Sequence, residues 1–223
     1  MTGPVVVLGM HRSGTSCLAG LLQEAGVDFG RDLPTRSIGN ALGSGESAEI
    51  VRLNDGVLAH SGGSWDRPPT EIRWRDQHVA LRDDIINEFQ DRQWGFKDPR
   101  TLLTLPFWED GLSEPRFIAT VRHPFAVAKS LEKARGIDFF DGLDLWLKYN
   151  HELLKARRRL GFPVLSFNLE ASSYDRAARA AISSLGLKPG NGIFFADSLR
   201  HGREVQPTLA QPLSTIYEEL IAC

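Results

Sequence analysis

The sequence is short of several features that define specialised classes of protein. It has only two cysteines, Cys17 and Cys223, among 223 residues. That number is too small for a disulfide framework and favours a reducing, cytoplasmic compartment. No apolar stretch approaches the roughly 18 residues of a membrane-spanning helix, and no basic region followed by an apolar run indicates a signal peptide. The formal net charge is only -2. We therefore expect no membrane span and no general affinity for nucleic acid, so any anion-binding site must be local.

The remaining composition is typical of a globular domain. Hydrophobic residues make up 42% of the sequence and charged residues 24%, which is enough apolar material for a buried core. No internal repeat, low-complexity tract or linker divides the chain, so we predict a single domain over residues 1–223. No spacing of cysteine and histidine indicates a metal site.

Short apolar runs alternate with helical patterns along the chain. Val5 to Leu8 is a continuous, largely β-branched run, which is typical of a strand buried on both faces. The other predicted strands are residues 94–97, 116–121 and 164–167. Helices are predicted from the first loop to Gly26, at 48–58, at 74–92, from Pro124, at 143–160 and at 177–185, with a short helix near the end. The rest of residues 27–70 reads as a long loop. This alternation predicts a three-layer α/β fold with a mostly parallel central sheet and helices on both faces.

A glycine-containing loop joins the first predicted strand to the first helix. It reads Gly9-Met10-His11-Arg12-Ser13-Gly14-Thr15-Ser16. The two glycines have the G-x-x-x-x-G spacing of phosphate-binding loops, in which backbone amides and a helix N-terminus bind an anion. Thr15 stands where ATPases and kinases carry a lysine, and the basic residues come earlier, at His11 and Arg12. We interpret the loop as a phosphate site; the alternative is an ordinary tight turn.

Two segments together resemble a known nucleotide site. Arg12-Ser13-Gly14-Thr15-Ser16 resembles the 5′-phosphosulfate loop of sulfotransferases that use 3′-phosphoadenylyl sulfate (PAPS). Arg122 at a strand end and Ser130 in the next helix are similar to the 3′-phosphate element of that family. Arginine offers a planar fork of donors to a phosphate dianion, and serine adds a hydroxyl. The resemblance extends to about residue 170. It implies a P-loop fold related to nucleotide kinases, with PAPS as co-substrate and adenosine 3′,5′-bisphosphate (PAP) as product.

The resemblance also implies catalytic groups. Sulfotransferases carry a lysine at a strand end comparable to that of Lys97, where a cation stabilises charge on the bridging oxygen of the leaving nucleotide. Glu46 closes a segment similar to a bacterial sulfotransferase motif, Asn-Pro-x-Gly-x-x-Glu, and is our candidate base. The chain departs from that motif at Ala41 and at Ser44-Gly45, and continues to Asn54-Asp55. In the alternative interpretation, Lys97 and its neighbours form surface ion pairs, and Glu46 is a solvated loop carboxylate.

Several further residues are weaker candidates. Arg200 and Arg203 lie in a basic cluster near the C-terminus. Cytosolic members of the family close over the nucleotide with a basic C-terminal segment, so these arginines are candidates for that role, and a solvated basic loop is the alternative. Trp65 is a candidate for the acceptor site. Alternative bases are Glu49, His11 and His60.

The sequence therefore predicts a sulfotransferase that moves a sulfuryl group from PAPS to a hydroxyl or amine of a small-molecule or carbohydrate acceptor, with no metal. In this hypothesis Glu46 accepts the proton, while Lys97 and Arg12 stabilise the departing phosphate. Two rivals stay open. A P-loop kinase would need a lysine at position 15 and an acidic residue at a strand end. A non-catalytic module would bind the nucleotide without turnover. The acceptor and the oligomeric state do not follow from the sequence.

Overall fold

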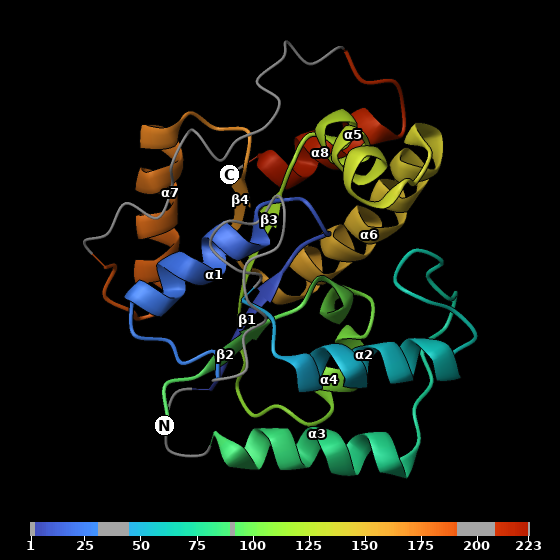
Figure 1. Cartoon of the computed structure of the whole chain (residues 1–223). Helices are drawn as coiled ribbons and strands as arrows, with labels where there is room; N and C mark the ends of the chain where they lie inside the picture. The colour runs from blue at the N-terminus through green and yellow to red at the C-terminus, as the bar shows by residue number, and fades with distance from the viewer. Residues whose placement is uncertain (1–2, 31–44, 90–91, 191–207, 223) are drawn as a thin grey trace.

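A parallel sheet forms the centre of the molecule (Figure 1). The computed structural model describes residues 3–30, 45–89, 92–190 and 208–222. Within them, the sheet has four strands in the order β2-β1-β3-β4, and each neighbouring pair is parallel. The strands are β1 (Val5–Leu8), β2 (Gly95–Lys97), β3 (Arg116–Val121) and β4 (Val164–Ser166). The predicted α/β fold with a parallel sheet is confirmed. The order places the carboxyl ends of β2 and β3 on either side of β1, and in open α/β sheets ligands bind at such ends.

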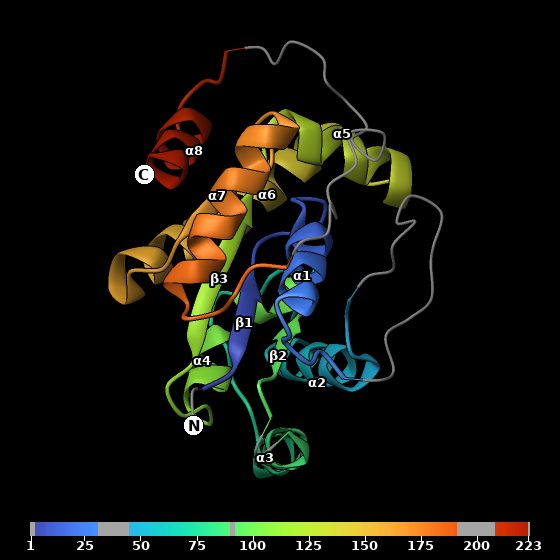
Figure 2. The same ribbon diagram turned by 90° about the vertical axis from the view of Figure 1, so that its left-hand side faces the viewer.

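Helices cover both faces of the sheet. They are α1 (Thr15–Glu24), α2 (Ala48–His60), α3 (Asp76–Glu88), α4 (Leu105–Glu109), α5 (Pro124–Arg135), α6 (Phe139–Leu160), α7 (Ala171–Ser184) and α8 (Leu213–Ile221), with a 3-10 helix, η1, at Pro99–Leu102. In Figure 1, α1 and α7 lie on one side of the sheet, and α2, α4, α6 and α8 lie on the other. Figure 2 shows α1 and α7 in front of the strands. None of the helices in the described ranges is long and apolar enough to cross a membrane.

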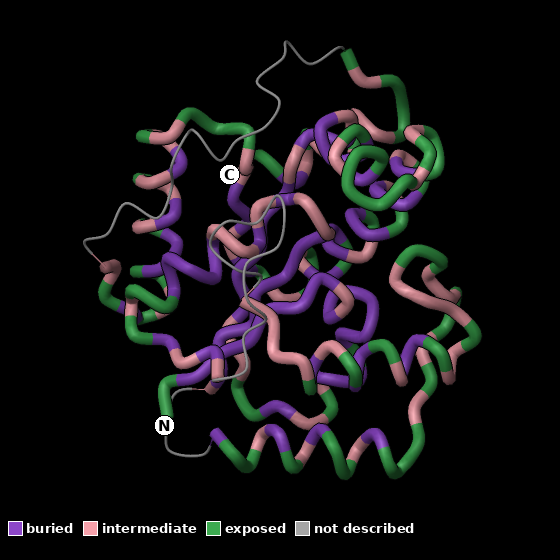
Figure 3. Tube along the Cα trace, in the orientation of Figure 1, coloured by how far each residue is buried: buried purple, intermediate pink, exposed green. Residues whose placement is uncertain are grey.

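The alternation of side chains along β1 explains the two layers. Val5 and Val7 point to the face covered by α1 and α7, and Val6 and Leu8 point to the opposite core. All four side chains are completely buried, because successive residues of a strand face opposite sides of a sheet. A strand buried on both faces has no polar position, as the sequence pattern indicated. Figure 3 shows the buried segments concentrated around the strands.

The structure corrects several predicted boundaries. Helix α6 begins at Phe139 and not at residue 143, because the Asp138 carboxylate accepts a hydrogen bond of 2.8 Å from the Phe140 amide and caps the helix. Leu145 and Tyr149 are buried on this helix, whereas Leu143 is only half-buried. Helix α7 begins at residue 171, before the predicted residue 177. Two elements, η1 and α4, were not predicted, because four or five residues are too few to show a helical period.

Candidate nucleotide and catalytic site

The loop between β1 and α1 has the geometry of an anion site. It leads from the buried end of β1 to the N-terminus of α1, where Gly14 is the N-cap with φ of 89°. Arg12 also adopts a left-handed φ, of 66°. A Cβ on Gly14 would run into the ring of Phe167, so both the backbone angle and the lack of space demand glycine there. Thr120 of β3 donates a 2.9 Å hydrogen bond to the Ser13 carbonyl and fixes the loop against the sheet.

Two buried polar atoms in this loop have no hydrogen-bond partner in the described part of the chain. Within the described residues, neither Ser13 Oγ nor His11 Nε2 has a hydrogen bond, although both atoms are buried. Buried polar atoms are normally paired, and each exception needs an explanation. A ligand rich in oxygen atoms, such as a nucleotide phosphate, fits such groups.

The residues predicted for the two ends of the nucleotide are in contact. Arg12 Nε donates to Ser130 Oγ at 2.9 Å, and Arg122 Nη1 donates to the Arg12 carbonyl at 3.3 Å. The Arg122 guanidinium also lies 5.7 Å from the centre of the Phe167 ring. Burial and the charge of Arg135 lower the pKa of Arg12. The two predicted anion sites are therefore adjacent and share the Arg12–Ser130 contact.

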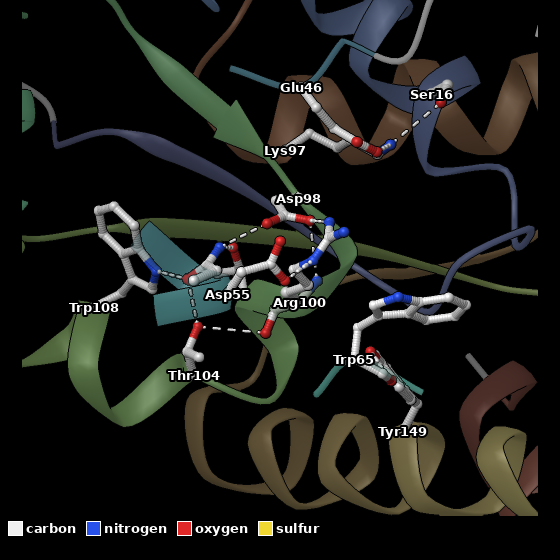
Figure 4. A network of polar contacts seen from close by, with 12 residues as sticks. Ser16, Glu46, Asp55, Trp65, Lys97, Asp98, Arg100, Thr104, Trp108 and Tyr149 are labelled. Atoms are coloured by element: carbon white, nitrogen blue, oxygen red, sulfur yellow. Dashed lines mark hydrogen bonds and ion pairs between the residues drawn. The ribbon is translucent and has the colours of Figure 1, made fainter. Parts of the chain in front are cut away.

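The two predicted catalytic groups meet beside the same loop (Figure 4). Lys97, the last residue of β2, forms an ion pair with Glu46 through Nζ and Oε1. The same ammonium lies 3.3 Å from Ser16 Oγ, in the first turn of α1. The Lys97 side chain is 3% exposed and that of Glu46 19%. The ion pairs of the alternative interpretation, Lys97 with a carboxylate and Asp98 with Arg100, do form, but neither is exposed at the surface as that interpretation expected. Cation and carboxylate lie together, almost out of solvent, at the start of α1.

Aromatic residues and cations surround His11. Its ring lies 4.6 Å from that of Trp65 and 6.1 Å from that of Tyr149. The Tyr149 hydroxyl donates to the Trp65 carbonyl at 2.9 Å, and the Arg135 guanidinium lies 5.9 Å from the centre of the Trp65 ring. Burial, followed by the charges of Arg100, Lys97, Arg135 and Arg12, holds the pKa of His11 well below its ordinary value of 6.5. His11 is thus neutral near pH 7 and adds no positive charge to the loop.

The weaker candidates lie in other places. Glu49 is exposed in the first turn of α2. His60 ends that helix, with its ring 5.7 Å from that of His78. Arg200 and Arg203 lie outside the described residues.

Comparison with known proteins gives two relevant structures. The sulfotransferase domain of the olefin synthase from Synechococcus PCC 7002 superposes with a TM-score of 0.60 and 17% identity, over 98% of this chain and 94% of that one. The sulfotransferase domain from the curacin biosynthetic pathway superposes with a TM-score of 0.54 and 14% identity, over 87% and 77% of the two chains. The chain has the fold of a sulfotransferase domain. No protein-family model and no curated protein sequence matches it.

The sulfotransferase fold explains why distant segments of the chain converge on one loop, but at such low identity it assigns no residue a role. Sequence reasoning missed three contributors to the site. Phe167 and Tyr149 gave no signal, because each stands in an ordinary apolar pattern. Asn54 gave two signals, although no role was predicted for it: it stands in the motif that continues to Asn54-Asp55, and it is polar within the apolar face of α2 formed by Ile50, Leu53 and Val57. The structure buries it completely.

Proposed function

We propose that this protein is a PAPS-dependent sulfotransferase that acts on a hydroxyl or amine of a small-molecule or carbohydrate acceptor and releases PAP. One observation carries the proposal. A single phosphate-type loop contacts Lys97, the ion-pair partner of Glu46, through Ser16, and it contacts Ser130 and Arg122 through Arg12. A nucleotide with phosphates on both sides of its ribose requires cations at two such places.

The residues divide into two groups around the nucleotide. Arg122 and Ser130 would bind the 3′-phosphate, which arginine contacts with a fork of donors. The amides at the start of α1, with Arg12, would bind the 5′-phosphate. The Arg12–Ser130 hydrogen bond gives the two groups a defined spacing before the nucleotide binds.

The proposed reaction is a direct transfer. The acceptor oxygen or nitrogen attacks sulfur, the bond from sulfur to the bridging phosphate oxygen breaks, and the acceptor proton moves to Glu46. Lys97 and Arg12 stabilise the negative charge that appears on the bridging oxygen. Lys97 lies between the loop and the base, so one cation can contact both the leaving oxygen and the carboxylate that receives the proton.

A magnesium-dependent kinase fits the site less well. Position 15 is a threonine, and β2 ends in Lys97. The acidic residue next to that strand end is Asp98, whose side chain is completely buried and accepts hydrogen bonds from Asn54 and Arg100. Its oxygens already serve protein donors, so Asp98 is poorly suited to hold a hydrated metal ion.

Calorimetric titration with PAP, with ADP as the matched nucleotide, tests the proposal. We expect PAP to bind at least about tenfold more tightly, because a charge-assisted bond to the 3′-phosphate contributes about 1.5 kcal/mol or more. Turnover of radiolabelled PAPS with a panel of phenols, amines and sugars, with and without EDTA, then separates the rivals. Tighter binding of ADP, or phosphate transfer from ATP that EDTA abolishes, would establish the kinase. Tight PAP binding without turnover of any acceptor would favour the non-catalytic module.

A further inference from the structure

Glu46 and Lys97 are far apart in the sequence, and a buried polar network joins the segments that carry them. Glu46 lies just before Ser47, the N-cap of α2, and Lys97 ends β2. Asn54, in the middle of α2, is completely buried. Its amide Nδ2 donates to Asp98 Oδ2 at 2.8 Å and to Thr101 Oγ1 at 3.1 Å. The residue that follows Lys97 is thus tied directly to the helix that follows Glu46.

The other half of the Asn54 amide is also satisfied. Its Oδ1 accepts hydrogen bonds from Thr104 Oγ1 at 2.7 Å and from Trp108 Nε1 at 2.8 Å (Figure 4). All of these partners are completely buried. With donors on one side and acceptors on the other, the amide cannot flip without losing bonds. A fully satisfied buried network of this kind fixes one arrangement of the segments that it joins.

Asp98 is held on its second side by η1. Its Oδ1 accepts from the Arg100 amide at 3.2 Å and from Arg100 Nη1 at 2.9 Å. Arg100 Nε donates in turn to Asp55 of α2 at 2.6 Å. Two adjacent residues of α2, Asn54 and Asp55, therefore bind the turn after β2 through Asp98 and Arg100. Burial raises the pKa of the Asp98 carboxyl, while Arg100 and Asn54 oppose that effect, so the charge of Asp98 depends on the same network.

We infer that Asn54 and Asp98 are positioning residues that set the place of Lys97 relative to Glu46 and the phosphate loop. The inference rests on the proposed function, because Lys97 and Glu46 are its catalytic groups. Neither Asn54 nor Asp98 contacts the substrate in this view; each acts through the backbone that carries Lys97. A displacement of about 1 Å at a catalytic group can reduce the rate about 100-fold, and the tie to α2 prevents such a displacement.

Exchanging the two residues tests the inference. In Asp98→Asn the single amide oxygen can serve either the two Arg100 donors or Asn54, and toward Arg100 it leaves two amide nitrogens face to face. Asn54→Asp places two carboxylates face to face, so each single variant disrupts the network. The double variant Asn54→Asp/Asp98→Asn restores the bond between the two side chains with the donor reversed. We expect kcat to fall about 100-fold in each single variant and to recover to within about tenfold of the parent in the double variant, with KM for PAPS nearly unchanged in all three.

Asn150→Asp is the matched control. Asn150 is also completely buried, and among the described residues its amide donates within its own helix, to the Trp146 carbonyl at 2.8 Å. This variant should lower the melting temperature but keep kcat per folded molecule. If the Asn54 variants lose stability and likewise keep kcat, the network is merely structural and the inference is wrong. Thr104→Val removes one hydrogen bond to Asn54 without a change of side-chain shape, so it is the variant that disturbs folding least. It should lower kcat about fivefold, as expected for the loss of one hydrogen bond. An unchanged kcat contradicts the inference.

An NMR measurement separates this inference from the proposed function. The Cε–Hε signals of Lys97, assigned with Lys97→Arg, should shift in both single variants and return in the double variant. If the parent protein fails to use PAPS, the proposed function is wrong, yet these signals still report on the position of Lys97. If they stay unshifted in both single variants, the inference is wrong whatever the reaction.

Discussion

A basic side chain lies beside the phosphate loop at the carboxyl end of β2 and another at the carboxyl end of β3, but the surrounding residues fix the two side chains differently. Lys97 at the end of β2 is buried against Glu46, and the turn behind it is locked by Asn54 and Asp98. Arg122 follows β3, is half-buried, and contacts the loop through the Arg12 carbonyl. The Trp146 indole donates to the Arg122 carbonyl at 2.9 Å, so the backbone here is held from α6.

The difference between the two strand ends suits two negative charges on the proposed nucleotide: the fixed charge of a phosphate and the charge that develops on the leaving oxygen. A phosphate dianion is present throughout the reaction, and a partly exposed guanidinium can bind it without rearrangement. Charge on a leaving oxygen appears only in the transition state, and a preorganised cation at low dielectric stabilises it most. We therefore expect changes at Lys97 to affect rate and changes at Arg122 to affect binding.

Lys97→Met should have the largest effect. If Lys97 stabilises the leaving oxygen as proposed, its loss should lower kcat about 100- to 1,000-fold, while the affinity for PAP falls less than about tenfold. Steady-state kinetics with calorimetry measures both. Lys148→Met, at an exposed position of α6, is the control and should match the parent. A similar loss of affinity and rate in Lys97→Met would remove the distinction between the two strand ends.

Arg122→Gln should have the next largest effect, on affinity. We expect PAP to bind about 10- to 100-fold more weakly, because a hydrogen bond to a charged group contributes about 1.5–3 kcal/mol. The difference should vanish for adenosine 5′-phosphosulfate, which has no 3′-phosphate. Arg92→Gln, at an exposed arginine paired with Asp28, controls for net charge. An equal loss of affinity for both nucleotides would mean that Arg122 serves another part of the ligand.

The central sheet and the loop could be predicted because they depend on local patterns. The run Val5–Leu8 is typical of a strand buried on both faces, and the loop after it has its own spacing of glycines. The resemblance then identified Lys97, Glu46, Arg122 and Ser130, and the structure brings all four to that loop.

The supporting contacts could not be predicted, because they join segments far apart in the sequence. The sequence showed Asn54 as part of the motif that continues to Asn54-Asp55, but it did not show the partners of Asn54, which come from the turn after β2, from η1 and from α4. Phe167, which follows β4, packs against Gly14, and no local sequence pattern predicts that contact. Nor could the sequence show that Lys97 and Glu46 pair, since ion pairing depends on the fold.

Gly14→Ala should weaken the loop that the two strand ends share. The substitution forces a left-handed φ of 89° on alanine and places Cβ against the Phe167 ring, so we expect a loss of about 1–3 kcal/mol of stability and weaker PAP binding. Gly161→Ala is matched: its φ is 68° but no atom lies within 4 Å of the added Cβ. It should cost about 1 kcal/mol of stability and leave binding unchanged. Equal PAP affinity in the two variants would show that the Gly14–Phe167 contact does not shape the nucleotide site.

The smallest expected effect concerns His11, which lies between the two strand ends. Its pKa is lowered well below 6.5, first by burial and then by the surrounding cations. The unfolded chain therefore takes up a proton near pH 6.5 that the folded protein does not bind, so the stability that His11 contributes is present above that pH and is lost as the pH falls. His78 and His123 have lowered pKa values too, and only a difference between variants isolates His11.

Urea unfolding of the parent and of His11→Gln, at several pH values from about 7.5 to about 5.5, measures that difference. Below pH 6.5 the free energy of unfolding should fall more steeply in the parent, by up to about 1.4 kcal/mol per pH unit. Parallel curves would mean that solvent reaches the ring and that the cations from the two strand ends do not act on it. PAP should flatten the parent's dependence, because the added phosphate charges offset the cations around His11 and raise its pKa toward the ordinary value.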